Sequence, residues 1–208
     1  MSDNLWDRRY SREGEIWNTS PSLTARFISQ NIPVSASLFE IGFGYGRDLV
    51  ALTKKGYNVT GIEASSIGRS MAVESLKNSK ITSSPWLLQG DFLNAVLPHQ
   101  KFDVVYSHRV IHLLQDDYAV NAYRDRVLEI IKDKGHLLLS ARDPRGVKPS
   151  RKGHHVSFWD AERFERVFGK DFAIEQLIEG EEIESASNPV PTYFTLMVAR
   201  RRVQKLIP

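Results

Sequence analysis

Three alternating glycines follow a short apolar run, in the stretch Glu40-Ile-Gly42-Phe-Gly44-Tyr-Gly46. Glycine allows the backbone to turn tightly with positive φ. It also lets a ligand lie against the main chain at the start of the next helix, where amide groups point outward. A strand-to-helix turn that merely needs glycine is the alternative, but this spacing favours a ligand-binding turn.

Glu63 stands 19 residues after Gly44, at the end of the next predicted strand. A carboxylate at this point of a β-α-β unit can accept both hydroxyls of a ribose. The pair therefore indicates an adenosine-containing cofactor. In the alternative interpretation, Glu63 is a charge at the start of a helix, beside Ser65 and Ser66.

The same turn is a poor match for NAD or NADP. The third glycine of the dinucleotide fingerprint would fall on Arg47 or Leu49, depending on where the count begins. Glu40 also disfavours a pyrophosphate, whereas Glu40 and Asp48 would suit a cationic cofactor.

Polar residues that could act on a second substrate follow the fourth predicted strand. His108 or His112 could take a proton from a nucleophilic substrate. Arg109 could bind a carboxylate with two parallel hydrogen bonds. Alternatively, each histidine packs as a neutral imidazole, and Arg109 pairs with an acidic residue of this chain.

Aromatic residues and two further histidines could form a lid over a bound substrate. An aromatic wall would suit a planar or apolar acceptor. No third ligand accompanies the adjacent histidines of the loop over 142–157, so we expect no metal site. The proposed lid and substrate residues are Trp6, Tyr10, Trp17, His154, His155 and Trp159. Trp17 and Trp159 could instead belong to the core.

Short apolar runs alternate with amphipathic ones, which predicts β-α-β units around a parallel sheet. We expect strands at 37–41, 58–62, 85–88, 102–106, 136–141, 172–177 and 193–200. We expect helices at 21–31, capped by Ser20, and at 47–55, 66–78, 116–132 and 160–168. Ligands of such sheets bind at the carboxyl ends of the strands, where the glycine turn and both His-containing segments should meet.

The composition is that of a globular protein. The 208 residues include 41% hydrophobic and 25% charged residues, and the net charge is +3. The absence of cysteine excludes a disulfide framework, thiolate metal sites and cysteine nucleophiles. Apolar runs are too short to span a bilayer, and the first residues lack the apolar region of a signal peptide, so we expect a cytoplasmic protein. An acidic run over 175–184 is interpreted as a solvated face, and cations of the loop over 142–157 favour an anionic acceptor.

The motifs together resemble the class I S-adenosylmethionine-dependent methyltransferases over about residues 20–200. Glu40–Gly46 resembles motif I of that family, and Gly61-Ile-Glu63 resembles the acidic end of its second strand. Gln89-Gly-Asp91-Phe92, Phe102–Ser107 and Lys134–Leu139 resemble the later strand motifs. The resemblance implies an α/β, Rossmann-like three-layer α-β-α sandwich. Its seven-stranded sheet would be mostly parallel with the last strand antiparallel.

The resemblance also implies S-adenosylmethionine as the cofactor and a role for each matching residue. Glu40 would orient the turn and the cofactor's ammonium group, and Glu63 would take the ribose hydroxyls. Asp91 would accept a hydrogen bond from the adenine amino group, and Phe92 would pack on the adenine ring. The Ser107 carbonyl would lie near the methionine end. The remaining cofactor residues implied are Gly42, Gly44 and Gly46, which cradle the methionine and ribose, and Ala64, which borders the adenine slot.

Within the superfamily, the chain resembles the small-molecule branch that includes TehB-like and thiopurine-methyltransferase-like enzymes. The residues behind this are the aromatic N-terminal segment, Gly46-Arg47-Asp48 and Ser107–His112. We therefore expect a lid segment over 1–20, a single catalytic domain over 21–208, and a monomer or homodimer. Methyl transfer would go to an O, N or S atom of a small acceptor.

Two alternatives remain open at this stage. A nucleic-acid or protein methyltransferase is one, although Ser107-His-Arg-Val110 stands where amino-methylating nucleic-acid enzymes carry [DN]-P-P-[YF]. The other is a protein that binds S-adenosylmethionine without catalysis.

Overall fold

A computed structural model describes residues 5–16, 20–81, 85–114, 116–143, 145, 157–185 and 188–203, with the side chains of 183–191 left out. Its centre is a seven-stranded sheet in the order β3-β2-β1-β4-β5-β7-β6. The strands are β1 (Ser37–Ile41), β2 (Asn58–Glu63), β3 (Trp86–Gln89), β4 (Phe102–His108), β5 (Ile131–Arg142), β6 (Phe172–Ser185) and β7 (Asn188–Arg201).

Strand directions match the predicted fold class. β1 pairs in parallel with β2 and β4, and the parallel pairing continues to β3 on one side and β5 on the other. β7 runs antiparallel to both of its neighbours, β5 and β6. A mostly parallel sheet with an antiparallel last strand is therefore confirmed.

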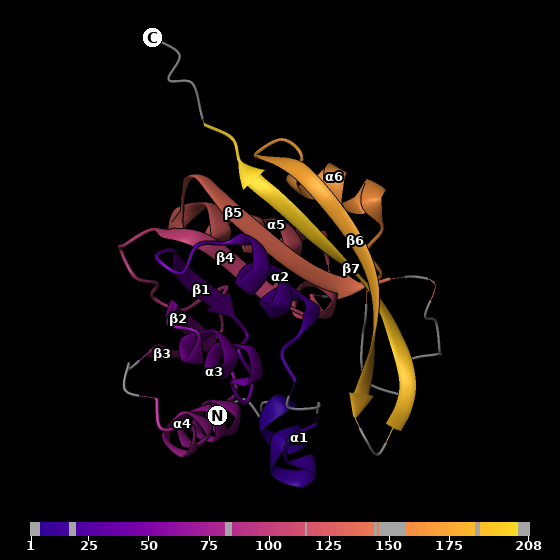
Figure 1. Cartoon of the computed structure of the whole chain (residues 1–208). Coiled ribbons are helices and arrows are strands. Elements are labelled where there is room, and N and C mark those ends of the chain that lie inside the picture. The colour runs from indigo at the N-terminus through magenta and orange to yellow at the C-terminus, as the bar shows by residue number, and fades with distance from the viewer. Residues whose placement is uncertain are drawn as a thin grey trace.

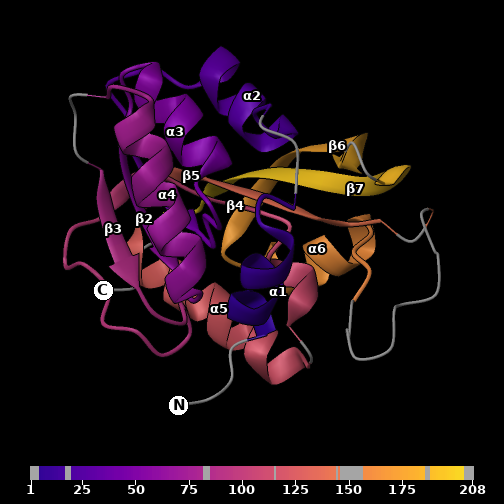
Figure 2. The ribbon, with the colours of Figure 1, turned by 90° about the horizontal axis from the view of Figure 1, so that it is seen from below.

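Helices cover both faces of this sheet, which gives the three layers (Figures 1 and 2). On one face lie α2 (Leu23–Asn31), α3 (Arg47–Lys54) and α4 (Ser66–Asn78), and on the other lie α5 (Asp117–Ile130) and α6 (Ala161–Phe168). Each layer buries its own apolar cluster, built on residues such as Ile28 and Leu49 on the first face and Val127 and Phe164 on the second. Strand side chains alternate between the two clusters because successive residues point to opposite faces.

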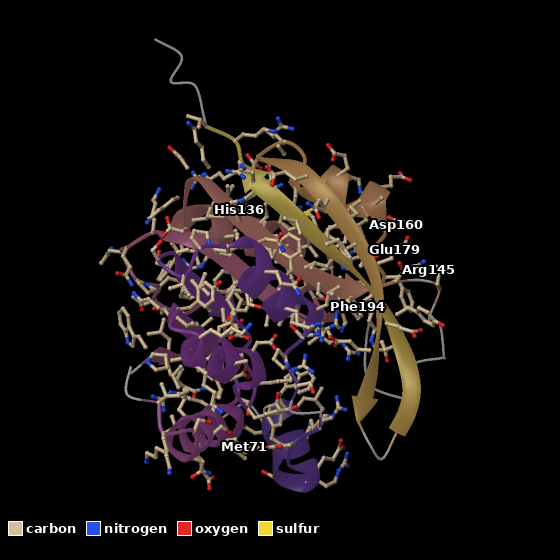
Figure 3. The ribbon with its side chains drawn as sticks, in the orientation of Figure 1. Met71, His136, Arg145, Asp160, Glu179 and Phe194 are labelled. Atoms are coloured by element: carbon tan, nitrogen blue, oxygen red, sulfur yellow. The ribbon has the colours of Figure 1, made fainter. Side chains whose placement is uncertain are left out.

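A helix that the sequence analysis did not predict precedes these layers. α1 (Leu5–Glu13) packs against α4 through Tyr10, which is 7% exposed, and through Trp6. Met71 of α4 faces it (Figure 3). Trp6 and Tyr10, two of the aromatic residues that suggested a lid segment, are thus presented by a helix.

Several predicted boundaries were wrong, and the last two strands differ most. β6 and β7 continue well beyond the predicted 172–177 and 193–200 and form a long hairpin, which extends past the neighbouring strands on the side of α1 (Figure 1). β5 begins at Ile131, so the preceding helix ends before the predicted Lys132. α2 starts two residues later than expected, since Ser22 rather than Ser20 accepts from the Ala25 amide and caps the helix.

No helix in the described part of the chain combines the length and apolar character needed to cross a membrane.

Candidate functional site

A pocket of about 960 Å³, counting the space open to solvent, lies at the carboxyl ends of β1, β2 and β4. The predicted site residues that line it are Trp6, Tyr10, Glu40, Gly42, Gly44, Glu63, Ala64, Asp91, Phe92, His108 and Arg109.

The glycine turn approaches other parts of the pocket wall too closely for side chains. Gly44 has φ 57°, and a Cβ there would come within 2.8 Å of the Tyr10 hydroxyl. Gly42 has φ 72°, and its Cβ would meet Val110 at 2.5 Å. Gly46 differs, because it caps α3 and packs against Ala72, outside the pocket lining.

Glu63 is held beside this turn by two backbone amides. The Gly44 N–H donates to Oε2 and the Ser65 N–H donates to Oε1, each at 2.7 Å. The residue is 6% exposed, and burial raises the pKa of its carboxyl group despite these bonds. Carboxylate oxygens each accept more than one hydrogen bond, so the group can still receive ribose hydroxyls.

Glu40 is a buried acid at the floor of the pocket. The Tyr106 hydroxyl donates to it at 2.8 Å. Burial, followed by the nearby charge of Asp48, raises the pKa of Glu40 well above its usual value. Asp48 is itself held by the Ser22 amide at 2.8 Å and approached by Arg47 Nε at 3.5 Å. A cation in the pocket would offset the repulsion between these two acids.

The adenine end expected from the sequence also lies in the pocket wall. Asp91 is exposed there and accepts from the Leu93 amide at 3.1 Å and from the Asn94 side chain at 2.7 Å. Phe92 is buried against Phe39 and Tyr123. This arrangement places a carboxylate next to an apolar ring, as an adenine site requires.

His108 lines the opposite side of the pocket with both ring nitrogens engaged. Nδ1 lies 3.1 Å from the Thr24 hydroxyl and Nε2 lies 3.0 Å from Glu182. Burial lowers its pKa although the Glu182 charge opposes this. Proton uptake from an acceptor at His108 would therefore require one of these contacts to break.

Arg109, the next residue, has an unusual backbone conformation for a non-glycine residue. Its φ is 64°, and its N–H donates to the Ser140 carbonyl at 2.9 Å. Left-handed backbone of this kind is costly and often occurs at functional sites. The conformation places Arg109 in the pocket wall, where the sequence analysis expected it.

Besides Gly46, three other predicted residues in the described part of the chain do not line the pocket. His112 is buried, and its Nδ1 has no hydrogen-bond partner among the described residues. Ser107 is buried too, and its side chain accepts from the Tyr123 hydroxyl at 3.0 Å. Trp159 as a lid residue was wrong: it is fully buried among Phe164 and Phe168, because α6 needs a large apolar anchor on the sheet.

Trp17, His154 and His155 lie outside the described residues.

A link between α1 and the cofactor side was not foreseen. Asp7 accepts from the Ser65 hydroxyl at 2.5 Å and from the Ile67 amide at 3.1 Å, at the start of α4. Ser65 also donates its amide to Glu63. The helix over the pocket is thus joined through a single serine to the carboxylate expected to hold the ribose.

Glu182 is the second residue that the sequence analysis missed. It was assigned to a solvated acidic face, yet its side chain is only 10% exposed and contacts His108. Its signal was the period-2 pattern of Ile178, Gly180 and Glu182, which places the three on one face of a strand. That signal needed a strand extending beyond 177.

Comparisons with known proteins agree with the class of site. Residues 39–139 match the family model described as a methyltransferase domain. EEF1A lysine methyltransferase 2 of Mus musculus is 28% identical over 155 residues, which cover 65% of this chain and 63% of that protein. The Danio rerio protein of the same name is 34% identical over 118 residues, 48% of either chain. The chain thus matches about half to two thirds of the length of these relatives.

Solved structures share the fold at low identity. A structure titled "Conversion of a Disulfide Bond into a Thioacetal Group during Echinomycin Biosynthesis" has a TM-score of 0.80 at 17% identity, covering 97% of this chain and 92% of that chain. TehB from Haemophilus influenzae has a TM-score of 0.71 at 18% identity, and the match covers 95% of this chain and 67% of that chain. Magnesium protoporphyrin IX methyltransferase from Synechocystis PCC 6803 with bound SAM has a TM-score of 0.65 at 16% identity, and the match covers 86% of this chain and 76% of that chain. These neighbours show that the fold is shared, and the match over 39–139 is to a methyltransferase domain.

Proposed function

We propose that this chain transfers a methyl group from S-adenosylmethionine to a small-molecule acceptor, as in the TehB-like and thiopurine-methyltransferase-like branch. The observation that carries the proposal is a single pocket that joins the glycine turn and Glu63 to the aromatic side chains of α1. Tyr10 reaches the turn itself, so α1 restricts the space above it. A confined and partly aromatic pocket suits a small acceptor better than an extended polymer.

The residues present fit the cofactor. Gly42 and Gly44 supply the positive-φ backbone of a tight turn in the pocket wall, and Glu63 supplies the acceptor for ribose hydroxyls. Asp91, Phe92 and Ala64 would hold the adenine, and Glu40 would face the ammonium group. When bound, S-adenosylmethionine supplies a methyl group on a positively charged sulfur.

On the acceptor side, the chain's contribution is mainly positioning and exclusion of water. Trp6 and Tyr10 provide an aromatic wall that would favour a planar acceptor and hold it in line with the methyl group. Arg109 would bind an anionic group of that acceptor. His108 lines the pocket and is the candidate for taking a proton from an alcohol or ammonium nucleophile, whereas His112 lies outside the lining. Thiols and acids are already partly ionised near neutral pH.

A second candidate function is methylation of a protein lysine. The match to EEF1A lysine methyltransferase 2 favours it. A lysine side chain could enter the same pocket from a protein surface. The acidic groups Glu40 and Asp48 near the turn would attract its ammonium group.

Fractionation of a cell extract separates the two candidates. The chain is incubated with methyl-labelled S-adenosylmethionine and either the small-molecule fraction or the macromolecular fraction. We expect label in the small-molecule fraction. Label confined to protein would favour lysine methylation, and Gly44→Val serves as the control that should remove transfer in either case.

A further inference from the structure

Glu182 reaches from the β6–β7 hairpin into the space between α2, α3 and the end of β4. The Leu23 amide donates to Oε1 at 3.0 Å, so the carboxylate helps to hold the start of α2. Its other oxygen lies 3.0 Å from His108 Nε2 and 3.8 Å from Arg47 Nη2. These partners, led by the His108 hydrogen bond, outweigh burial and lower the pKa of Glu182 to about 2.

These contacts determine the tautomer of His108. An ionised carboxylate accepts hydrogen bonds and donates none, so Nε2 must carry the proton. In the neutral ring Nδ1 is then an acceptor, and it receives the hydroxyl of Thr24 at 3.1 Å. The His108 and Phe194 rings pack in a T-shaped arrangement with their centroids 5.8 Å apart. His108 is therefore fixed in orientation from three sides.

Neighbouring acids of the same strand lack this role. Glu181 is exposed, because adjacent residues of a strand point to opposite faces. Glu179 pairs with Arg145 away from the pocket, and Figure 3 shows the two side chains next to each other at the outer strand. The inward position of Glu182 is thus specific to its register, not a property of the acidic run.

We propose that Glu182 is a positioning residue for the acceptor side of the pocket, which fixes His108 as the Nε2–H tautomer and holds its ring in the wall. The inference rests on the proposed function, since it assigns His108 to the side that receives the acceptor. Other charged groups face the same imidazole. They are Arg47 and Asp48 from α3 and His112 from the 3-10 turn Ile111–Leu113. Among them and Glu182, Glu182 makes the hydrogen bond to the ring, at 3.0 Å.

The test compares Glu182→Gln with the matched control Glu181→Gln in the full chain. A glutamine amide can both donate and accept, so it permits either tautomer of His108, whereas the control removes a charge at the exposed neighbour. Histidine side chains are labelled with ¹⁵N, and long-range ¹H–¹⁵N spectra report which nitrogen carries the proton. His108→Asn assigns the signal.

We expect the wild type and Glu181→Gln to show the Nε2–H tautomer, and Glu182→Gln to show a mixture. Methyl transfer to whichever extract fraction the wild type labels should fall at least about tenfold in Glu182→Gln, the scale of one hydrogen bond to a charged group. Affinity for S-adenosylhomocysteine should stay within about twofold, because the cofactor contacts lie elsewhere; a twofold change is only about 0.4 kcal/mol.

Either of two results would overturn the proposal. One is an Nδ1–H tautomer in the wild type, and the other is a Glu182→Gln variant whose tautomer or transfer rate equals that of the wild type. A purely structural role would instead lower transfer and cofactor affinity together. If the wild type labels neither fraction, the proposed function fails, while the spectra still decide whether Glu182 sets the tautomer.

Discussion

Tyr10 of α1 and Gly44 of the glycine turn face each other so closely that a Cβ on Gly44 would lie 2.8 Å from the tyrosine hydroxyl. Residues 34 positions apart in the sequence thus form opposite walls of one pocket. A helix that the sequence did not predict, α1, therefore contributes directly to the pocket wall.

Gly44→Ala should weaken binding of S-adenosylhomocysteine by at least about tenfold, or about 1.4 kcal/mol. The added methyl group meets Tyr10, and the left-handed backbone adds about 1–2 kcal/mol of strain. Gly56→Ala is the control, because Gly56 has φ 92° and open space around its Cβ. Calorimetry should find normal affinity in Gly56→Ala, and part of the loss should be recovered in the double variant Gly44→Ala/Tyr10→Phe. Intact affinity in Gly44→Ala would show that the turn is not the cradle.

Glu40→Gln should stabilise the free protein increasingly as the pH rises. The pKa of Glu40 is raised in the folded state above its ordinary value of 4.5, so the folded protein binds this proton more tightly than the unfolded chain does. The wild type consequently loses stability as the pH rises from 4.5 through the folded pKa, and glutamine removes that loss. Thermal melts at pH 5 and pH 8 test the trend, with exposed Glu74→Gln as the control. A melting difference that shrinks with rising pH would contradict it.

The same Glu40→Gln variant should bind S-adenosylmethionine less tightly. Its neutral amide gives up the attraction between a buried carboxylate and the cofactor's ammonium group. Calorimetry at pH 8 would record higher stability together with lower affinity, whereas a purely structural Glu40 would leave affinity unchanged.

Asp7→Ala should release α1 from the start of α4. The substitution removes the contacts to Ser65 and Ile67 and costs about 1 kcal/mol, as the loss of a helix cap does. Hydrogen exchange should accelerate over 5–13 and remain unchanged in the central strands. Glu13→Ala is the control, because Glu13 pairs with Arg9 and Arg12 of α1 itself. Equal protection of α1 in Asp7→Ala and wild type would refute the attachment.

Trp6 and Trp159 should respond to alanine in opposite ways. Trp159→Ala should lower the free energy of unfolding by about 3–5 kcal/mol, because it removes a fully buried aromatic side chain. Trp6→Ala should leave unfolding nearly unchanged and reduce methyl transfer, since Trp6 lines the pocket. Urea denaturation and the extract assay separate the two effects. Similar instability in both variants would place Trp6 in the core as well.

The sequence predicted the fold well where local patterns were strong. The β-branched run at Asn58–Ile62 and the glycine turn after Ile41 marked the first β-α-β unit. The predicted helix over 160–168 is also found, as α6, with Asp160 as its cap. The antiparallel last strand, in contrast, was expected only from the family resemblance, since strand pairing depends on contacts far apart in the chain. Most of the expected cofactor residues follow successive parallel strands, and the structure brings them to one pocket at the carboxyl ends of those strands.

Features that depend on tertiary contacts were missed. α1 carries a charged and aromatic sequence, and its stabilising contacts are with α4. One of them joins its own Asp7 to Ser65 at the start of α4. Glu182 looked like its exposed neighbours because only the register of a long hairpin decides which acid turns inward. Trp159 could not be distinguished from a lid residue by type alone, because large aromatic side chains serve both purposes.

The pocket draws its two halves from separate parts of the chain. The proposed nucleoside cradle comes from one continuous stretch, Glu40 to Phe92, whereas a second part of the wall combines Trp6 and Tyr10 with His108, which Glu182 supports. Sequence drift in the early helix or the late hairpin can therefore remodel the second wall while the first stays intact. An enzyme arranged in this way can diversify its repertoire of acceptors without rebuilding its methyl donor site.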